Sequence, residues 1–340
     1  MEKILVTGGM GFIGSNFIRF ILNLDQDFSI INIDKLTYAG NPENLKDINK
    51  LFPNQYRFYK EDICNFDLID KIIKKEHVDF IVNFAAESHV DRSIDNPFTF
   101  CNTNFMGTQS LLNAAKINNI KKYIQISTDE VYGSLHFEDP PFTEQTLLSP
   151  NSPYSASKAS ADLLVKSYYK TYDLPINITR CSNNYGPYQF PEKFIPLIIT
   201  NALNNKQLPV YGKGINVRDW IHVIDHCKAI IKVLFDGKVG EIYNISGNSE
   251  ISNIHLVKKI LEILDKPESL ITFVKDRPGH DLRYAINHDK ITNEINWKPK
   301  IDFNKGLKST IQWYIDKKDW LNSVINKDYL IYYEKQYKNR

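Results

Sequence analysis

The chain has 340 residues, of which 42% are hydrophobic, and this is enough for a sizeable core in one large or two ordinary domains. Its 42 basic and 40 acidic residues give a net charge of +2, which argues against nucleic acid or a membrane surface as a partner. The four cysteines form no Cys-x-x-Cys pair, and no apolar run approaches the length of a membrane span. We therefore expect a cytoplasmic enzyme that acts on a small molecule, with reduced cysteines and no metal.

The first expected strand, residues 3–7, leads into a glycine turn and then into a helix with apolar residues at helical spacing. Gly8, Gly11 and Gly14 follow the pattern Gly-x-x-Gly-x-x-Gly, which is a variant of the dinucleotide-binding fingerprint. Such a turn brings backbone close to a pyrophosphate, and the N-terminus of the helix favours the negative charge. A glycine trio alone is weak evidence, so its strand and helix context carries the prediction.

A second strand is expected at residues 30–34 and ends in Asp34, about 20 residues beyond the last glycine. A carboxylate at this position accepts hydrogen bonds from the adenosine ribose hydroxyls and disfavours a 2′-phosphate. We therefore expect NAD and not NADP. Lys35 and Thr37 are expected as neighbouring polar contacts, although a solvated loop would carry the same residue types.

Strand and helix patterns continue to alternate, with strands expected at 56–59 and 80–84 and a helix at 68–75 between them. Repeated units of this kind predict an α/β fold, a doubly wound parallel sheet of the Rossmann type. Small or polar residues at the strand ends would meet the cofactor at the ligand-binding edge. These residues are Asp62, Ile63, Phe84, Ala85 and Ala86. A long helix is expected to begin at Pro97 and to reach Lys116.

Two adjacent carboxylates end the next expected strand. Residues 123–126 have strand character and lead into Thr128, Asp129 and Glu130. Ligands bind at the carboxyl end of strands in open parallel sheets, so this pair is a candidate for acid–base chemistry. An isolated pair of acids is more often a solvated turn, and other residues must decide between these roles.

A helix is expected to start near Pro153 and to carry Tyr154 and Lys158 on the same face, one turn apart. A nearby ammonium group favours the phenolate, so we expect Lys158 to lower the pKa of Tyr154 and to make it a usable base. The same spacing occurs often by chance on ordinary helices, where the lysine extends along the surface.

Beyond the strand that follows this helix, the pattern becomes intermittent. Residues 182–193 form a loop rich in amide and aromatic groups. We expect a cofactor-binding domain over residues 1–185, to which residues 220–250 return, and a smaller mixed α/β substrate domain over 186–320. Residues 321–340 are expected to be a tail of unknown role.

Several residues of the second half have two possible roles. Arg218, Arg277 and His280 would clamp a phosphate group, although surface ion pairing is the usual role of a single arginine. Tyr211 would either stack on a base or fill the core of the smaller domain. Neither role is decided by these residues alone.

Two histidines have a spacing that a metal site would use. His222 and His226 are four residues apart, but the residues between them include no glutamate and no third ligand is evident. Packing or helix capping is therefore the favoured role of both side chains.

Taken together, these residues resemble the extended short-chain dehydrogenase/reductase superfamily and, within it, the dTDP-glucose 4,6-dehydratases. The resemblance covers about residues 1–320. Besides the glycine turn and the Tyr-x-x-x-Lys pair, the matching stretches are 36–41, 85–93, 127–133, 183–193, 216–220 and 277–281. Met10, where relatives often carry alanine, leaves the three glycines intact.

The resemblance implies a bound NAD that is reduced and reoxidised within one turnover. Tyr154, poised by Lys158, would remove the proton of the glucose 4-hydroxyl while hydride passes from C4 to NAD, and Thr128 would hydrogen-bond the 4-keto oxygen. Glu130 would then remove the C5 proton while protonated Asp129 donates to the departing C6 hydroxyl. Return of hydride to C6 would give a nucleotide-linked 4-keto-6-deoxyglucose.

The resemblance also implies the residues that contact each ligand. The expected cofactor contacts are Gly8, Gly11, Phe12, Ile13, Gly14, Asp34, Lys35, Thr37, Asp62, Ile63, Phe84, Ala85, Ala86, Thr103, Tyr154 and Lys158. The expected substrate contacts are Ser88, Thr128, Asn183, Glu192, Lys193, Tyr211, Arg218, Asn253, Arg277, His280 and Tyr284. A homodimer through the helices near 97–116 and 153–172 is a further expectation.

Three alternatives stay open. The first is a 4,6-dehydratase for another nucleotide glucose, such as UDP-glucose. The second is a nucleotide-sugar 4-epimerase, which shares the cofactor site but needs no acid–base pair to eliminate water, so Asp129 and Glu130 argue against it. The third is a non-catalytic NAD-binding protein, against which the intact Thr128, Tyr154 and Lys158 argue.

Overall fold

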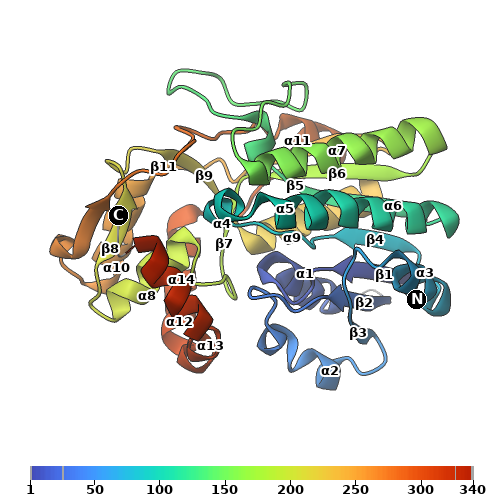
Figure 1. Ribbon diagram of the computed structural model, residues 1–340, viewed down its shortest axis with the longest axis horizontal. Coiled ribbons are helices and arrows are strands. Elements are labelled where there is room, and N and C mark those ends of the chain that lie inside the picture. Colours follow the sequence, from blue (N-terminus) through green and yellow to red (C-terminus); the bar gives the residue numbers. More distant parts are fainter. Residues whose placement is uncertain (1, 25–26, 326, 338–340) are drawn as a thin grey trace.

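A seven-stranded sheet forms the larger lobe of the computed structural model, which describes residues 2–24, 27–325 and 327–337 (Figure 1). The strand order is β10-β6-β5-β4-β1-β2-β3, and every neighbouring pair is parallel. The strands are β1 (Glu2–Thr7), β2 (Phe28–Asp34), β3 (Tyr56–Lys60), β4 (Phe80–Asn83), β5 (Lys122–Thr128), β6 (Ile176–Cys181) and β10 (Ile242–Ile245). The predicted doubly wound parallel sheet is confirmed.

Helices cover both faces of this sheet because its strands carry apolar side chains on both sides. In β5, for example, all seven residues are buried. One face packs against α1 (Phe12–Leu22), α9 (Val223–Asp236) and α11 (Asp289–Ile295). The other face packs against α3 (Phe66–Glu76), α6 (Thr108–Ile117) and α7 (Pro153–Tyr172).

The helix expected from Pro97 to Lys116 is present in three consecutive parts. It consists of α5 (Pro97–Phe100), the π-helical segment η2 (Cys101–Gly107) and α6, and it follows the short helix α4 (Val90–Asp95). Three further short helices are η1 (Pro42–Leu45), α2 (Ile48–Leu51) and η4 (Glu268–Leu270). The helix expected near Pro153 is also confirmed, as α7.

A smaller lobe lies beside the carboxyl ends of the large sheet (Figure 1). It contains a three-stranded sheet of β7 (Asn183–Tyr185), β9 (Val217–His222) and β11 (Glu250–Ser252), and a parallel pair of β8 (Leu208–Tyr211) and β12 (Ile271–Val274). Its helices are α8 (Phe194–Leu203), α10 (Asn253–Leu264), α12 (Phe303–Asp316), α13 (Lys318–Val324) and α14 (Lys327–Tyr337). The domain boundaries given above stay a prediction.

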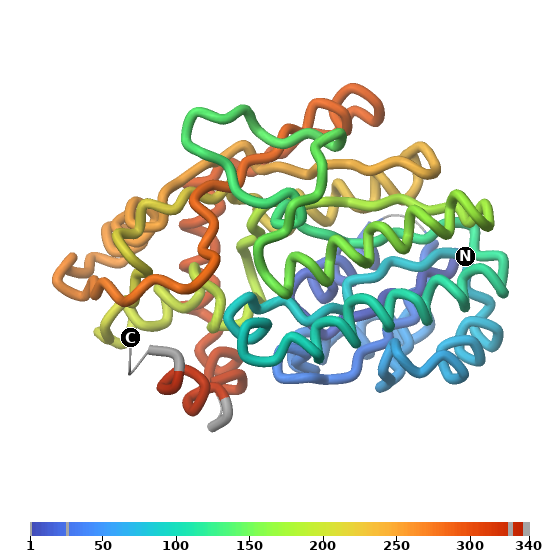
Figure 2. Tube along the Cα trace, turned by 45° about the horizontal axis from the view of Figure 1, so that its top comes forward, coloured from blue at the N-terminus to red at the C-terminus, as the bar shows by residue number. Residues whose placement is uncertain are grey.

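The crevice between the lobes is where the chain leaves β1, β2, β4, β5 and β6. Ligands of doubly wound proteins bind outside these carboxyl ends. In Figure 2 the N-terminus lies at the far end of the larger lobe, whereas the C-terminal segment lies against the smaller one. The helices α13 and α14 therefore lie on the side of the molecule away from the N-terminus.

Candidate active site

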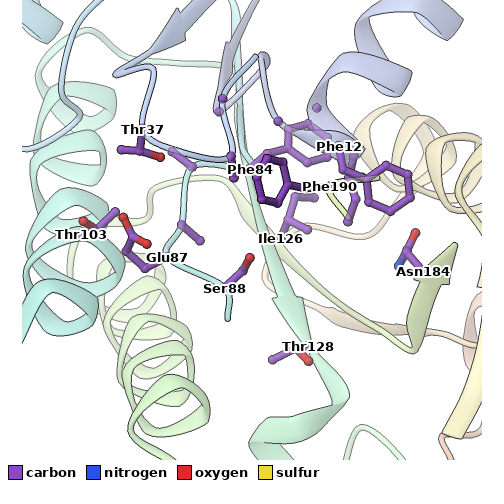
Figure 3. Close-up of a pocket in the computed structure, with 18 of the residues that line it drawn as sticks. Phe12, Thr37, Phe84, Glu87, Ser88, Thr103, Ile126, Thr128, Asn184 and Phe190 are labelled. Atoms are coloured by element: carbon purple, nitrogen blue, oxygen red, sulfur yellow. The ribbon is translucent and has the colours of Figure 1, made fainter. Parts of the chain in front are cut away.

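One pocket of about 300 Å³ collects the predicted cofactor residues and the predicted catalytic residues. It is lined by all of the residues expected to contact the cofactor and by Thr128, Asp129 and Glu130. Of the expected substrate contacts outside the catalytic set, Ser88, Asn183, Glu192 and Lys193 line it as well. Figure 3 shows Thr37 and Thr103 on one side of this pocket and Thr128 at the end of its strand.

The glycine turn brings backbone segments of β1, α1 and β4 closer together than side chains would permit. Gly8 has a φ of +70°, and a Cβ there would lie 2.6 Å from the backbone nitrogen of Ala85. A Cβ on Gly14 would lie 2.4 Å from the carbonyl oxygen of Gly8. The turn can bring these backbone segments together only because Gly8 and Gly14 lack a side chain, and we call the space that the turn encloses the cradle.

Asp34 supports this cradle as well as facing it. Its carboxylate accepts hydrogen bonds from the backbone N–H groups of Met10 at 2.9 Å and Leu36 at 2.8 Å. Burial raises the pKa of Asp34, and these two hydrogen bonds oppose the increase. Beside it, Lys35 forms an ion pair of 2.6 Å with Asp62, which joins the loops after β2 and β3 at the rim. These residues fit a dinucleotide: a side-chain-free turn, a helix N-terminus and a strand-end carboxylate.

The acid pair sits where β5 passes into the short helix η3 (Asp129–Tyr132). The Thr128 hydroxyl accepts a hydrogen bond from the backbone N–H of Glu130 at 3.3 Å and donates to Asp129 Oδ1 at 3.2 Å. Asp129 is 2% exposed, and its Oδ2 has no hydrogen-bond partner among residues 2–24, 27–325 and 327–337. The pair is thus not the solvated turn that isolated acids would form.

The two carboxyl groups have different surroundings. Burial raises the pKa of Asp129 well above its ordinary value, and the neighbouring Glu130 and Asp219 raise it further. Burial also raises the pKa of Glu130, but Arg277, Arg218 and Lys193 oppose that increase. The pair therefore favours a proton on Asp129 and a charge on Glu130.

Tyr154 and Lys158 reach the pocket from the first turns of α7. A capping box fixes this end of the helix, because the Ser152 hydroxyl accepts from the Ser155 N–H and the Ser155 hydroxyl accepts from the Ser152 N–H. The Lys158 ammonium donates to the Ile126 carbonyl of β5 at 2.6 Å. This bond ties the helix to the strand that leads into the acid pair.

The expected lowering of the Tyr154 pKa is wrong for the residues of this chain by themselves. Burial raises the pKa of Tyr154 well above its ordinary value, and the Glu130 carboxylate raises it further. Burial also lowers the pKa of Lys158, and Asp162 opposes that decrease. Sequence spacing shows which groups are adjacent, but it does not show how deeply they are buried.

The remaining predicted substrate residues form a charged wall that the smaller lobe contributes. Tyr211 donates to Asp91 at 2.9 Å, and Arg277 lies 3.5 Å from the same carboxylate. The Arg218 guanidinium lies 4.3 Å from the centre of the Tyr284 ring. The positive charges of Arg218 and Arg277 both act on Glu130, so this wall lies near the acid pair.

Two predicted substrate residues lie at the margin of this wall. His280 contacts the Tyr211 ring, with centroids 5.9 Å apart, and its Nδ1 lies 2.6 Å from Asp276. Asn253 opens α10, and its backbone N–H donates to the Asn216 carbonyl at 2.9 Å. His280 therefore borders the charged wall through Tyr211, whereas Asn253 is joined by its backbone to the residue that precedes β9.

His222 and His226 have structural roles, as expected. His222 caps α9 by accepting from the Ile224 N–H, and His226 is buried with its Nδ1 2.9 Å from Asn184 Oδ1. In the described part of the chain, no group of three or more His, Cys, Asp or Glu side chains could hold a metal ion. Nor does that part contain a helix long and apolar enough to span a membrane.

Comparisons with known proteins agree with this geometry. Residues 5–310 match the family described as GDP-mannose 4,6 dehydratase. The dTDP-glucose 4,6-dehydratase of Shigella flexneri is 48% identical, with 99% of each chain covered. The chain belongs to the dTDP-glucose 4,6-dehydratase family.

Solved structures of the dTDP-glucose 4,6-dehydratase family resemble this chain throughout. The Bacillus anthracis dehydratase in complex with NAD is 52% identical, with a TM-score of 0.89 over 95% of this chain and 100% of the other. The Streptomyces venezuelae dehydratase with NAD and TYD bound is 45% identical, with a TM-score of 0.92 over 95% and 99%. A UDP-glucose 4-epimerase from Thermotoga maritima shares the fold at 26% identity and a TM-score of 0.86.

Sequence reasoning missed several residues of this dehydratase-family site. Asp91 joins Tyr211 to Arg277, and Arg92 forms an ion pair of 3.0 Å with Glu192. Tyr38 covers one face of that arginine. Asp91, Arg92 and Tyr38 lie inside stretches that resemble the family, and the signal that could have found Asp91 and Arg92 is the run of polar and charged residues at 87–93.

Proposed function

We propose that this protein is an NAD-dependent hydro-lyase that converts dTDP-glucose to dTDP-4-keto-6-deoxyglucose. The observation that carries the proposal is the Asp129–Glu130 pair, in which Asp129 is buried and Glu130 is half-buried, and which lines the same pocket as Tyr154. Elimination of water needs one group that accepts a proton and another that donates one, and a 4-epimerase has no use for such a pair. The names of the full-length relatives support the same reaction.

NAD is the proposed cofactor, held by the glycine turn, Asp34 and the strand-end residues that line the pocket. When bound, NAD would supply the hydride acceptor for C4 of the sugar and the hydride donor for C6. Gly8 and Gly14 leave the space that a pyrophosphate would take, and Asp34 offers a carboxylate beside that space. Lys35, Thr37 and the remaining predicted contacts complete the proposed cofactor site.

Tyr154 is the proposed base for the 4-hydroxyl of the sugar, and Lys158 is proposed to hold it in place. Because burial and Glu130 raise the pKa of Tyr154, the phenol is a poor base until positive charge enters the pocket. Thr128 is proposed to hydrogen-bond the oxygen at C4. Its link to Asp129 would couple this oxygen to the acid pair.

Glu130 is the proposed base at C5, and Asp129 is the proposed acid at C6. The C5–H bond breaks as the proton moves to Glu130, and the C6–O bond breaks as the hydroxyl leaves with the proton of Asp129. The electron pair of the C5–H bond forms the C5=C6 double bond, and the electron pair of the C6–O bond leaves with the hydroxyl, which the proton of Asp129 turns into water. The surroundings of the two groups support this order, since Asp129 retains its proton more strongly.

The nucleotide and its two phosphates are proposed to bind the charged wall. Arg218, Arg277 and Lys193 supply positive charge there, and guanidinium groups match phosphate geometry. The other proposed substrate contacts are Ser88, Asn183, Glu192, Tyr211, Asn253, His280 and Tyr284. In the proposed division, residues 1–185 and 220–250 hold the cofactor and residues 186–320 mainly hold the nucleotide sugar.

The proposed function is tested by incubating the protein with dTDP-glucose and measuring the ultraviolet absorbance of the keto product in alkali. UDP-glucose serves as the parallel substrate, and the preferred nucleotide is expected to be dTDP. A 6-hydroxyl retained in a 4-inverted product would indicate an epimerase. Absence of keto product from every nucleotide glucose would exclude the dehydratase.

A homodimer is proposed through α5, η2, α6 and α7. These helices leave large apolar side chains exposed, among them Phe98 at 79%, Met106 at 51% and Leu163 at 58%. Leu163→Glu is expected to convert the dimer to a monomer in sedimentation experiments, whereas a wild-type monomer at micromolar concentration would contradict the proposal. Because the reaction uses NAD and a nucleotide sugar, we also propose a cytoplasmic location.

A further inference from the structure

The helix α14, labelled in Figure 1, was expected from the sequence to be part of a tail, but it contacts Phe190, which lines the pocket. Tyr329 is 6% exposed, donates to the Pro191 carbonyl at 3.2 Å and contacts the Phe190 ring. Tyr333 accepts from the Asn201 side chain of α8 at 2.9 Å. These contacts attach α14 to the segment that leads from β7 to α8.

A second set of contacts joins α14 to α4, on the other side of the crevice. Lys335 forms an ion pair of 2.8 Å with Asp95, and the Tyr332 ring stacks on Arg92. The Arg92 guanidinium lies 3.8 Å from the centre of the Tyr332 ring and 3.8 Å from the centre of the Tyr38 ring. Two aromatic rings thus contact a single guanidinium.

The Arg92 guanidinium forms an ion pair with Glu192, a residue of the pocket. Arg92 Nε donates to Glu192 Oε2 at 3.0 Å, and Glu192 is 7% exposed. The next residue, Lys193, donates to the Ser88 carbonyl at 2.7 Å, and its charge acts on Glu130. Both Glu192 and Lys193 line the pocket. A continuous series of contacts therefore runs from Tyr332 through Arg92 to the substrate end of the site.

We propose that Tyr332 is a positioning residue, which keeps Arg92 on Glu192 and thereby sets Glu192 and Lys193 for the substrate. This inference rests on the proposed function. Without a ring over its outer face, the guanidinium would be open to water and free to leave the carboxylate. The Tyr332 hydroxyl has no hydrogen-bond partner among the residues that the structure describes. The aromatic ring is therefore the part of Tyr332 that we propose to hold Arg92.

The test compares two substitutions that differ in the aromatic face. Tyr332→Phe retains the ring, whereas Tyr332→Leu retains apolar bulk without it. We expect Tyr332→Leu to raise KM for dTDP-glucose by roughly tenfold, which is the order expected for a partly buried cation–π contact. Little change in kcat is expected, because η3 and α7 carry the acid pair and Tyr154. Tyr332→Phe should match the wild type.

Ile331→Ala is the matched control, because this side chain lies on the same helix and is 58% exposed. It should leave KM unchanged. Thermal unfolding of each variant identifies any general loss of stability, and the Leu variant is chosen over Ala to keep the helix packed. An unchanged KM in folded Tyr332→Leu, or an equal rise in Tyr332→Phe, would overturn the inference.

A double-mutant cycle tests whether Tyr332 acts through the ion pair. In an E192Q background Arg92 no longer has a carboxylate at residue 192 to pair with. The Tyr332 ring then has no ion pair to maintain, so Tyr332→Leu should add little to the KM of the E192Q variant. Additive effects would show that Tyr332 acts by another route and would contradict the proposal. An inactive wild type would instead remove the proposed function, so the two failures are distinguishable.

Discussion

The two halves of the pocket are built from different materials. The cofactor half consists mainly of backbone and small side chains, with Gly8, Gly14 and Ala85 in close approach and Asp34 beneath the turn. The substrate half consists of charged groups, including Lys193 and the guanidinium groups of the smaller lobe. Shape therefore controls recognition in the first half and electrostatics in the second. Asp129 and Glu130 lie where the two halves meet.

Glu130→Gln tests this meeting point and should have the largest effect. The substitution preserves shape and removes the proposed base at C5, so product formation should fall by about 10²- to 10⁴-fold. Reduction of the bound cofactor by substrate should persist, because the base for that step is Tyr154. Product absorbance in alkali, the ultraviolet absorbance of the reduced cofactor and solvent deuterium at C5 measure the three steps.

Glu138→Gln is a matched control, since this glutamate is exposed and lies outside the pocket. It should behave as the wild type. Loss of cofactor reduction in a folded Glu130→Gln variant would show that Glu130 serves the first step and that its proposed role is wrong. In the wild type, kcat should fall as pH falls through the raised pKa of Glu130, because the base must be ionised.

Arg277→Ala tests whether the substrate half also affects the pKa of Glu130. Loss of a guanidinium from the proposed phosphate site should raise KM for dTDP-glucose by roughly tenfold or more. Because Arg277 opposes the increase in the Glu130 pKa, its removal should raise that pKa further. The acid limb of the kcat/KM profile should therefore move to higher pH. A raised KM with an unmoved acid limb would separate the two functions of the wall.

The difference between the halves also explains what the sequence could predict. The cofactor half follows from local patterns, because one strand, one turn and one helix bring Gly8 and Gly14 together. The substrate half combines Asp91, Tyr211 and Arg277, which are far apart in the chain, so the sequence indicated Tyr211 and Arg277 as separate candidates but could not show that Asp91 joins them. The raised pKa of Tyr154 and the contacts of α14 depend on burial and docking, which no local pattern reports.

Gly14→Ala and Gly11→Ala probe the cofactor half, where the smallest effects are expected. A Cβ on Gly14 would lie 2.4 Å from the Gly8 carbonyl oxygen, whereas one on Gly11 would lie 3.3 Å from the same atom. Gly14→Ala should therefore destabilise the fold by about 1–3 kcal/mol, as overpacking does, and weaken NAD binding. Gly11→Ala should change the unfolding temperature much less.

Comparison of Gly14→Ala and Gly11→Ala distinguishes a glycine that is needed for packing of the chain from a glycine that is needed for binding of NAD. If shape governs this half, Gly11→Ala should weaken NAD binding with little loss of stability, because its methyl group meets the proposed pyrophosphate and not the chain. Calorimetric titration with NAD and thermal unfolding measure the two quantities. Unchanged NAD affinity in Gly11→Ala would mean that the backbone does not approach the pyrophosphate there, and that the charge of the helix N-terminus contributes more to binding than shape does.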